Sequence, residues 1–166
     1  MNDVSVALPH PPSESLQEAL AGRLASVVHI MKGRWSLWSE LGVLVLNDGA
    51  LSLHGANGVS LFTVEAEGVQ GRPHPRRLAL HQRYFRIRAA DRWWYLAPHV
   101  VPTRYQRCST RELVERYAVR ERAPRPIGMN EATYVQRVKN PSMHGVVWAR
   151  CWLQVLNMPN QHVGSS

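Results

Sequence analysis

Lysine, cysteine and acidic residues are scarce in this chain of 166 residues. The two cysteines, Cys108 and Cys151, lie far apart and form no CxxC or Cys/His spacing, which argues against a zinc site or a disulfide framework and favours reduced thiols. No apolar run approaches the ~20 residues that a membrane-spanning helix needs. The N-terminal residues lack the basic start and continuous apolar stretch of a signal peptide, so we expect a cytoplasmic protein without a transmembrane segment.

Enzyme signatures are missing as well. The sequence contains no GxSxG, GxxxxGKS/T or GxGxxG motif, and its eight histidines show no HExxH, HxH or His/Cys spacing. Its 12 acidic residues are too scattered to suggest a glycosidase pair or a nuclease cluster. The sequence therefore predicts a noncatalytic protein with no metal and no cofactor.

The positive charge is concentrated in one part of the chain. Residues Arg72 to Arg125 contain fourteen arginines against four acidic residues, a net charge of +10, whereas the rest of the chain carries −2. Such asymmetry favours an acidic partner, which could be phosphate, an anionic membrane surface or an acidic protein patch. Arginine suits two-pronged contacts with phosphate or carboxylate, although a genome rich in G and C would also favour arginine over lysine.

The N-terminal part predicts a tail and a helix. Residues 1–14 are punctuated by proline and show no periodicity, so a flexible tail is expected. Ser15 and Glu18 form a capping-box signal, and apolar residues then recur at helical spacing. We therefore expect an amphipathic helix over 15–32, from about Leu16 to Met31, which Gly33 ends.

The middle of the chain reads as an antiparallel meander, because short apolar stretches alternate with turn residues. Strands are predicted at Arg34–Trp38, Val43–Asn47, Ala50–His54, Val59–Val64, Arg76–Leu80, Tyr84–Arg88 and Trp93–Leu96. Asp48-Gly49 is a strong signal for a two-residue hairpin, and Gly55–Gly58 and Ala89–Arg92 predict two more turns. The prolines of Gly71–Pro75 cannot continue a central strand.

The C-terminal part predicts helices. A helix is expected over Thr110–Arg122, and residues 123–158 form a helical extension. Within the extension, Asn130 caps a short helix through Val138, and the apolar segment Val146–Met158 reads as a helix by its length although its pattern also fits a strand. Residues 159–166 are a tail.

Together these elements predict an α+β fold: a partly open antiparallel β-barrel or sandwich of about seven strands with N-terminal and C-terminal helices. The segments LGVLVLNDGALSLHGANGVSLFTVEAEGVQG (41–71) and RRLALHQRYFRIRAADRWWYLAP (76–98) contain the last six of these strands in order. This layout resembles the pleckstrin-homology-like superfold, particularly its bacterial and GRAM-type members, over about 33–122. The resemblance implies a binding or scaffold module rather than an enzyme.

The sequence departs from the lipid-binding members of that superfold in two places. Val43–Asn47 lacks the basic motif that those members carry near their first strand pair, so the resemblance does not extend to their phosphoinositide pocket. Their last helix carries a tryptophan that plugs the barrel, whereas Thr110–Arg122 has none. Trp148 or Trp152 could take that part only if the segments between are insertions.

The stretch YFRIRAADRWWYLAP (84–98) concentrates arginine and aromatic residues on one side of a predicted hairpin. Because successive strand residues point to opposite sides, Phe85, Ile87, Trp94 and Leu96 face the interior together with Leu78 and Leu80. The other side collects the candidate ligand-binding residues, which we name the basic aromatic face: Arg77, Tyr84, Arg86, Arg88, Trp93 and Tyr95.

Two interpretations compete for this face. It is structural if arginines stack on the rings and the C-terminal apolar segment roofs them. It is functional if it stays open and engages an acidic protein surface or anionic membrane lipid, or alternatively if it serves a nucleic-acid-binding component of a larger complex. A third hypothesis is a subunit of a larger assembly whose segment Val146–Met158 docks on a partner.

Overall fold

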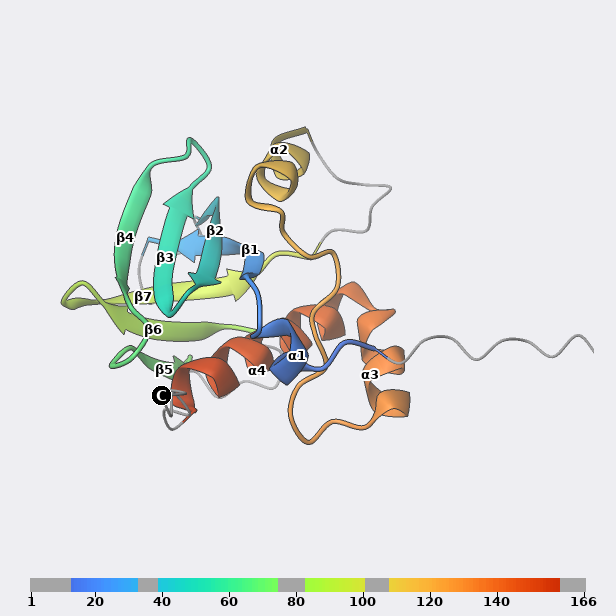
Figure 1. The fold of residues 1–166 in the computed structure, drawn as a ribbon. Coiled ribbons are helices and arrows are strands. Elements are labelled where there is room, and N and C mark those ends of the chain that lie inside the picture. The colour runs from blue at the N-terminus through green and yellow to red at the C-terminus, as the bar shows by residue number, and fades with distance from the viewer. Residues whose placement is uncertain (1–12, 33–38, 75–82, 101–107, 159–166) are drawn as a thin grey trace, which may run out of the picture.

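The computed structural model describes residues 13–32, 39–74, 83–100 and 108–158. Their seven strands form one antiparallel sheet in the order β4-β3-β2-β1-β7-β6-β5, which is not closed into a barrel. The strands are β1 (Leu24–Met31), β2 (Ser39–Asn47), β3 (Ala50–Gly55), β4 (Ser60–Glu65), β5 (Gln70–Pro73), β6 (Phe85–Ala89) and β7 (Arg92–Pro98). The helices are α1 (Leu16–Ala19), α2 (Cys108–Tyr117), α3 (Glu131–Val138) and α4 (Pro141–Asn157). The α+β class is thus confirmed, as an open sheet with helices (Figure 1).

Two of the predicted hairpin turns form as the local sequence requires. Asp48 and Gly49 have φ angles of 50° and 77° and join β2 to β3. Ala90 and Asp91, at 49° and 60°, join β6 to β7 in the same way. Positive φ at both central residues matches the twist of the flanking strands, so these turns fix the register of both hairpins.

The prediction of a helix over 15–32 is wrong for most of that range. The capping box of Ser15 and Glu18 is present, but α1 ends at Ala19 and the chain re-enters as β1. β1 lies between β2 and β7 and is buried on both faces. A strand covered on both sides is a nearly continuous apolar run, which periodicity alone does not distinguish from a helix.

Helix α4 covers one face of the sheet, as Figure 1 shows below the strands. Trp152 is fully buried there, and its indole nitrogen donates a hydrogen bond of 2.8 Å to the Ser26 hydroxyl on β1. Gly71 on β5 lies so close to α4 that an added Cβ would meet Leu156 at 3.0 Å. The helical interpretation of Val146–Met158 is confirmed, and the segment packs on its own sheet rather than remaining available to a partner.

Helix α2 packs on the other face of the sheet, over β1 and β2. Leu113 joins Val27 in a second, smaller core. The ring of Tyr117 stacks on His54 at a centroid distance of 5.0 Å. The predicted helix over Thr110–Arg122 therefore forms, but it ends early because Ala118 takes a φ of 50°.

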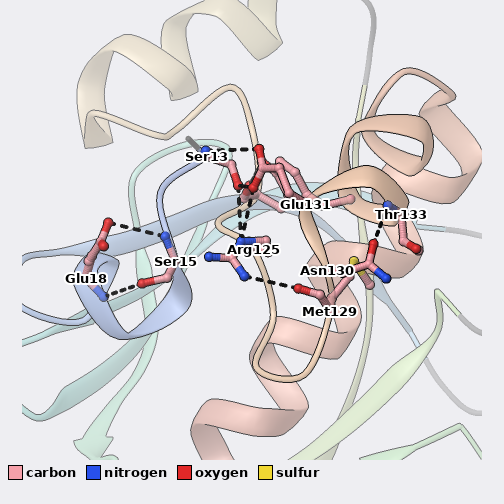
Figure 2. Close-up of polar contacts among 10 residues, drawn as sticks. Ser13, Ser15, Glu18, Arg125, Met129, Asn130, Glu131 and Thr133 are labelled. Carbon is pink, nitrogen blue, oxygen red and sulfur yellow. Dashed lines mark hydrogen bonds and ion pairs between the residues drawn. The ribbon is translucent and has the colours of Figure 1, made fainter. Parts of the chain in front are cut away.

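The start of the described chain is tied to the first residue of α3 and to the segment before it (Figure 2). The hydroxyl and amide of Ser13 donate to the Glu131 carboxylate at 2.5 and 3.1 Å, and these bonds lower the pKa of Glu131. The Arg125 guanidinium contacts both partners, donating to the Ser13 hydroxyl at 3.2 Å and pairing with Glu131 at 3.4 Å. Asn130 caps α3 as predicted, through the Thr133 amide.

Several predicted elements lie outside the described residues. These are the strands at 34–38 and 76–80, residues 1–12 of the expected N-terminal tail and the tail over 159–166. β5 was not predicted; it is an edge strand that ends at Pro73, in agreement with the expectation that these prolines cannot lie in a central strand. No helix formed by the described residues combines the length and apolar character needed to cross a membrane.

Candidate functional site

The alternation expected in β6 and β7 is confirmed. Phe85, Ile87 and Leu96 are fully buried and belong to the main core with α4, and Trp94 joins them. The intervening residues of the basic aromatic face lie on the opposite side, where Arg88 is exposed and the others are half-buried. Arg77 lies outside the described residues.

The C-terminal segment does not roof the aromatic rings. Helix α4 packs beneath the buried residues of β6 and β7, on the other side of the sheet from Trp93 and Tyr95. On the side of the rings, the contacts of α2 are with β1 and β2. The prediction that the C-terminal segment covers these rings is therefore wrong. The arginine–ring stacking that the same interpretation proposed does occur.

Arginine stacks on tryptophan at the centre of the face. The Arg86 guanidinium carbon lies 4.4 Å from the centroid of the Trp93 ring, and that of Arg88 lies 5.9 Å from it. Both distances fall within the ≈ 6 Å range of cation–π attraction. The Nε of Arg86 is buried and has no hydrogen-bond partner among the described residues. A guanidinium that lies over a ring still has N–H donors that a carboxylate or phosphate oxygen is able to accept.

The two tyrosines of the face pack around a histidine that sequence reasoning missed. His74 follows β5 and is buried, and its ring lies 5.7 Å from that of Tyr95 and 6.2 Å from that of Tyr84 in edge-on geometry. The Tyr84 hydroxyl also accepts a hydrogen bond of 3.3 Å from Arg83. The two tyrosine rings therefore pack against a buried residue and also contribute to the surface of this face.

A further arginine joins the face from β5. Arg72 is the register partner of Arg86 across the β5 and β6 pair, so the two side chains emerge on the same side as direct neighbours. Like charges placed directly opposite one another destabilise a sheet by roughly 0.2–1 kcal/mol. Sequence reasoning missed Arg72 because β5 itself was not predicted.

These arginines lack acidic partners within the described chain. The ion pairs between described residues join Arg111 to Glu115, Arg120 to Glu14 and Arg125 to Glu131, and none involves the basic aromatic face. The internal segments outside the described ranges, 33–38, 75–82 and 101–107, contain no aspartate or glutamate at all. The positive charge of the face is therefore not neutralised by these segments.

Two histidines far apart in sequence also meet beside this face. His29 on β1 and His99 after β7 are hydrogen-bonded through Nε2 and Nδ1 at 2.6 Å, and the Nδ1 of His29 contacts the Ser39 hydroxyl at 3.0 Å. Burial, and then the charge of Arg83, hold the pKa of His29 below its ordinary value. Among the described residues no three His, Cys, Asp or Glu side chains gather as a metal site would require.

Comparison with known proteins gives no further guide to this site. No protein-family model matches the chain, and no curated protein matches it. What the site does is therefore argued from its own geometry.

Proposed function

We propose that this chain is a noncatalytic binding domain whose basic aromatic face engages an acidic protein surface. The observation that carries the proposal is the opposed pair Arg72 and Arg86, which lies without an acidic partner among the described residues. Such a pair costs stability in the free protein, and an acidic group bound between the two guanidinium groups offsets that cost. Trp, Tyr and Arg are also the residues that most often anchor protein interfaces.

The engagement of the rings favours anion binding over the stacking of nucleic-acid bases. The Trp93 ring already holds the Arg86 guanidinium, and Tyr84 and Tyr95 already contact His74. A base that stacked on Trp93 would have to displace the arginine and forfeit its cation–π contact. A carboxylate instead binds guanidinium donors without displacing the arginine from the Trp93 ring.

The distribution of exposed apolar side chains favours a protein partner over a membrane. Membrane-surface domains insert apolar side chains beside their basic residues. The exposed large apolar residues of the described chain are Val59, Leu61, Ile127 and Val135. Val59 and Leu61 lie at the β4 edge, four strands from β7, and the other two belong to α3 and the segment before it. None of them borders the basic aromatic face.

The proposal includes a relationship to the pleckstrin-homology-like superfold. Its support is that β1 to β7 follow one another along the chain, that neighbouring strands pair antiparallel, and that the helices of the described residues lie before and after the strands. A further support is Trp152, which is buried and packs on the sheet from α4, since the lipid-binding members of that superfold carry a tryptophan in their last helix.

The test is a binding assay with a matched charge control. The site variant is Arg72→Glu with Arg88→Glu, two exposed residues of the face, and the control is Arg23→Glu with Arg150→Glu, two exposed residues elsewhere. Both variants change the net charge equally. The probes are a fluorescent peptide of alternating glutamate and serine, phosphatidylserine vesicles, and single-stranded oligothymidylate.

We expect the site variant to bind the glutamate peptide at least about tenfold more weakly, as the loss of charge-assisted hydrogen bonds predicts, and the control to bind like the wild type. Equal weakening in both variants would show attraction by net charge alone and would contradict a defined site. Site-dependent binding of the vesicles or the oligonucleotide in preference to the peptide would assign the face to that partner instead.

A further inference from the structure

A cleft of about 240 Å³, lined by no described residue of the basic aromatic face, lies where α2, the start of α4 and the segment after β7 meet. Its wall combines buried polar groups, basic side chains and valines from elements that are far apart in the sequence. The volume lies below the ≈ 300 Å³ at which sites for drug-sized ligands begin, so any occupant is small.

Two buried polar side chains line this cleft. Thr110 is 4% exposed, and its hydroxyl forms no hydrogen bond with any described residue. His144 is also 4% exposed, and its Nε2 accepts the Ala123 amide at 2.9 Å, so the ring proton lies on Nδ1. Burial and the charge of Arg122 lower the pKa of His144 to about 4, which keeps this ring a neutral donor at pH 7. The Thr110 hydroxyl, which lines the cleft, is able to hydrogen-bond to a group bound there.

The charge around the cleft favours one negative charge. Arg120, Arg122 and Lys139 line it together with a single acid, Glu121. Arg120 is already paired with Glu14, which leaves one positive charge in excess. The first turn of α4, at Pro141 and His144, adds the positive end of a helix of 17 residues.

The rest of the wall is apolar except for Ser26 and His99. Val27, Val100, Val114 and Val138 line it from four different elements, and the buried ring of Trp148 closes it on the α4 side. A ligand that satisfies both halves of the wall therefore carries one anionic group and a short hydrocarbon part.

We propose that this cleft binds a small monocarboxylate with an unbranched aliphatic tail. Its carboxylate accepts hydrogen bonds from the Thr110 hydroxyl and from Lys139 at the C-terminal end of α3. Its tail lies among the valines and against Trp148. This site is separate from the basic aromatic face, and neither proposal depends on the other.

The test is isothermal titration calorimetry of the full chain with acetate, butanoate, hexanoate and octanoate, and with hexan-1-ol as the uncharged match. We expect affinity to rise by about fourfold for each added methylene group, as the burial of a CH₂ predicts, and then to stop rising once the tail outgrows the cleft. Affinity independent of tail length, or hexanol binding as tightly as hexanoate, would overturn the proposal.

Two variants locate the site. Thr110→Val keeps the shape of the side chain and removes the hydroxyl, and Lys139→Gln removes an exposed charge. We expect each to bind hexanoate roughly threefold to tenfold more weakly. The control is Arg150→Gln, which removes an exposed charge from α4 outside the cleft and leaves binding unchanged. Wild-type affinity in the folded Lys139→Gln variant, or equal loss in Arg150→Gln, would contradict the assignment.

Discussion

Replacing Arg86 by methionine tests whether this arginine stabilises the fold or binds an acidic partner. Methionine retains an unbranched apolar stem that can lie on the Trp93 ring, but it carries no charge and no donors. If the arginine serves mainly to bind an acidic partner, the Arg86→Met variant keeps its stability and loses its affinity for the glutamate peptide. If the arginine serves the fold, its loss destabilises the protein.

The contacts of Arg86 give the expected size of the effect. Loss of the cation–π contact at 4.4 Å costs about 0.5–2 kcal/mol. Removal of the buried Nε, which has no described partner, raises the free energy of unfolding by about 1–3 kcal/mol. Removal of the charge opposite Arg72 raises it by roughly 0.2–1 kcal/mol. Together these effects place the free energy of unfolding of the variant between about 1 kcal/mol below and about 3 kcal/mol above the wild-type value, so no large loss of stability is expected.

Urea unfolding followed by far-ultraviolet circular dichroism measures this difference. The midpoint is expected to fall by no more than about 1 M, because the slope for small proteins is about 1–3 kcal/mol/M. The matched control is Phe85→Ala, the fully buried neighbour on the same strand, which is expected to lose about 3–5 kcal/mol. A loss above about 3 kcal/mol in Arg86→Met, or unchanged peptide affinity, would refute the assignment of Arg86 to binding.

Three further changes test the fold. Ala90→Gly is expected to raise the free energy of unfolding by roughly 0.5–1 kcal/mol, since glycine adopts the φ of 49° without the strain of a Cβ. Gly42→Ala is expected to lower it by about 3 kcal/mol, because the new Cβ would lie 2.4 Å from the His54 carbonyl oxygen. In the folded protein the pKa of His144 is about 4, against an ordinary value of 6.5, so between these pH values the unfolded chain binds a proton that the folded chain does not. Roughly 3 kcal/mol of stability that is present above pH ~6.5 is therefore lost as the pH falls toward ~4. His144→Gln keeps an acceptor for the Ala123 amide and is expected to remove that part of the pH dependence.

Each of these changes has its own check. Gly22→Ala, where no atom lies within 4 Å of the new Cβ, is expected to alter stability by less than about 0.5 kcal/mol. Ala89→Gly, in the adjoining strand, is expected to destabilise, and a gain there equal to that of Ala90→Gly would contradict the turn geometry. If wild type and His144→Gln lose stability in parallel between neutral pH and pH ~4, the buried neutral histidine is ruled out.

Local rules were sufficient wherever one residue or one turn decides the conformation. Asp48-Gly49 and Ala90-Asp91 supply positive φ, and both hairpins form at those positions. Asn130 caps α3 because its side chain needs only the amide three residues later. The two faces of β6 and β7 were also predictable, since alternate side chains of a strand must point to opposite sides.

The sequence could not reveal which groups meet across the sheet. Arg72 opposes Arg86 only because β5 pairs with β6, and β5 is too short to signal itself. His29 and His99 lie 70 residues apart and meet because β1 pairs with β7. Distances of this kind depend on strand order, which local spacing does not encode.

The sequence by itself determined the turns, the later helices and the two-sided character of the β6 and β7 hairpin, because each follows from backbone angles and the two-residue period of a strand. Tertiary structure decided that Leu24–Met31 is a central strand rather than a helix, since burial on both faces removes the alternation that would identify it. It also decided that α4 lies beneath the apolar side, where its buried residues join Phe85 and Ile87 in one core. That choice leaves the arginines and rings on the side of the sheet away from α4.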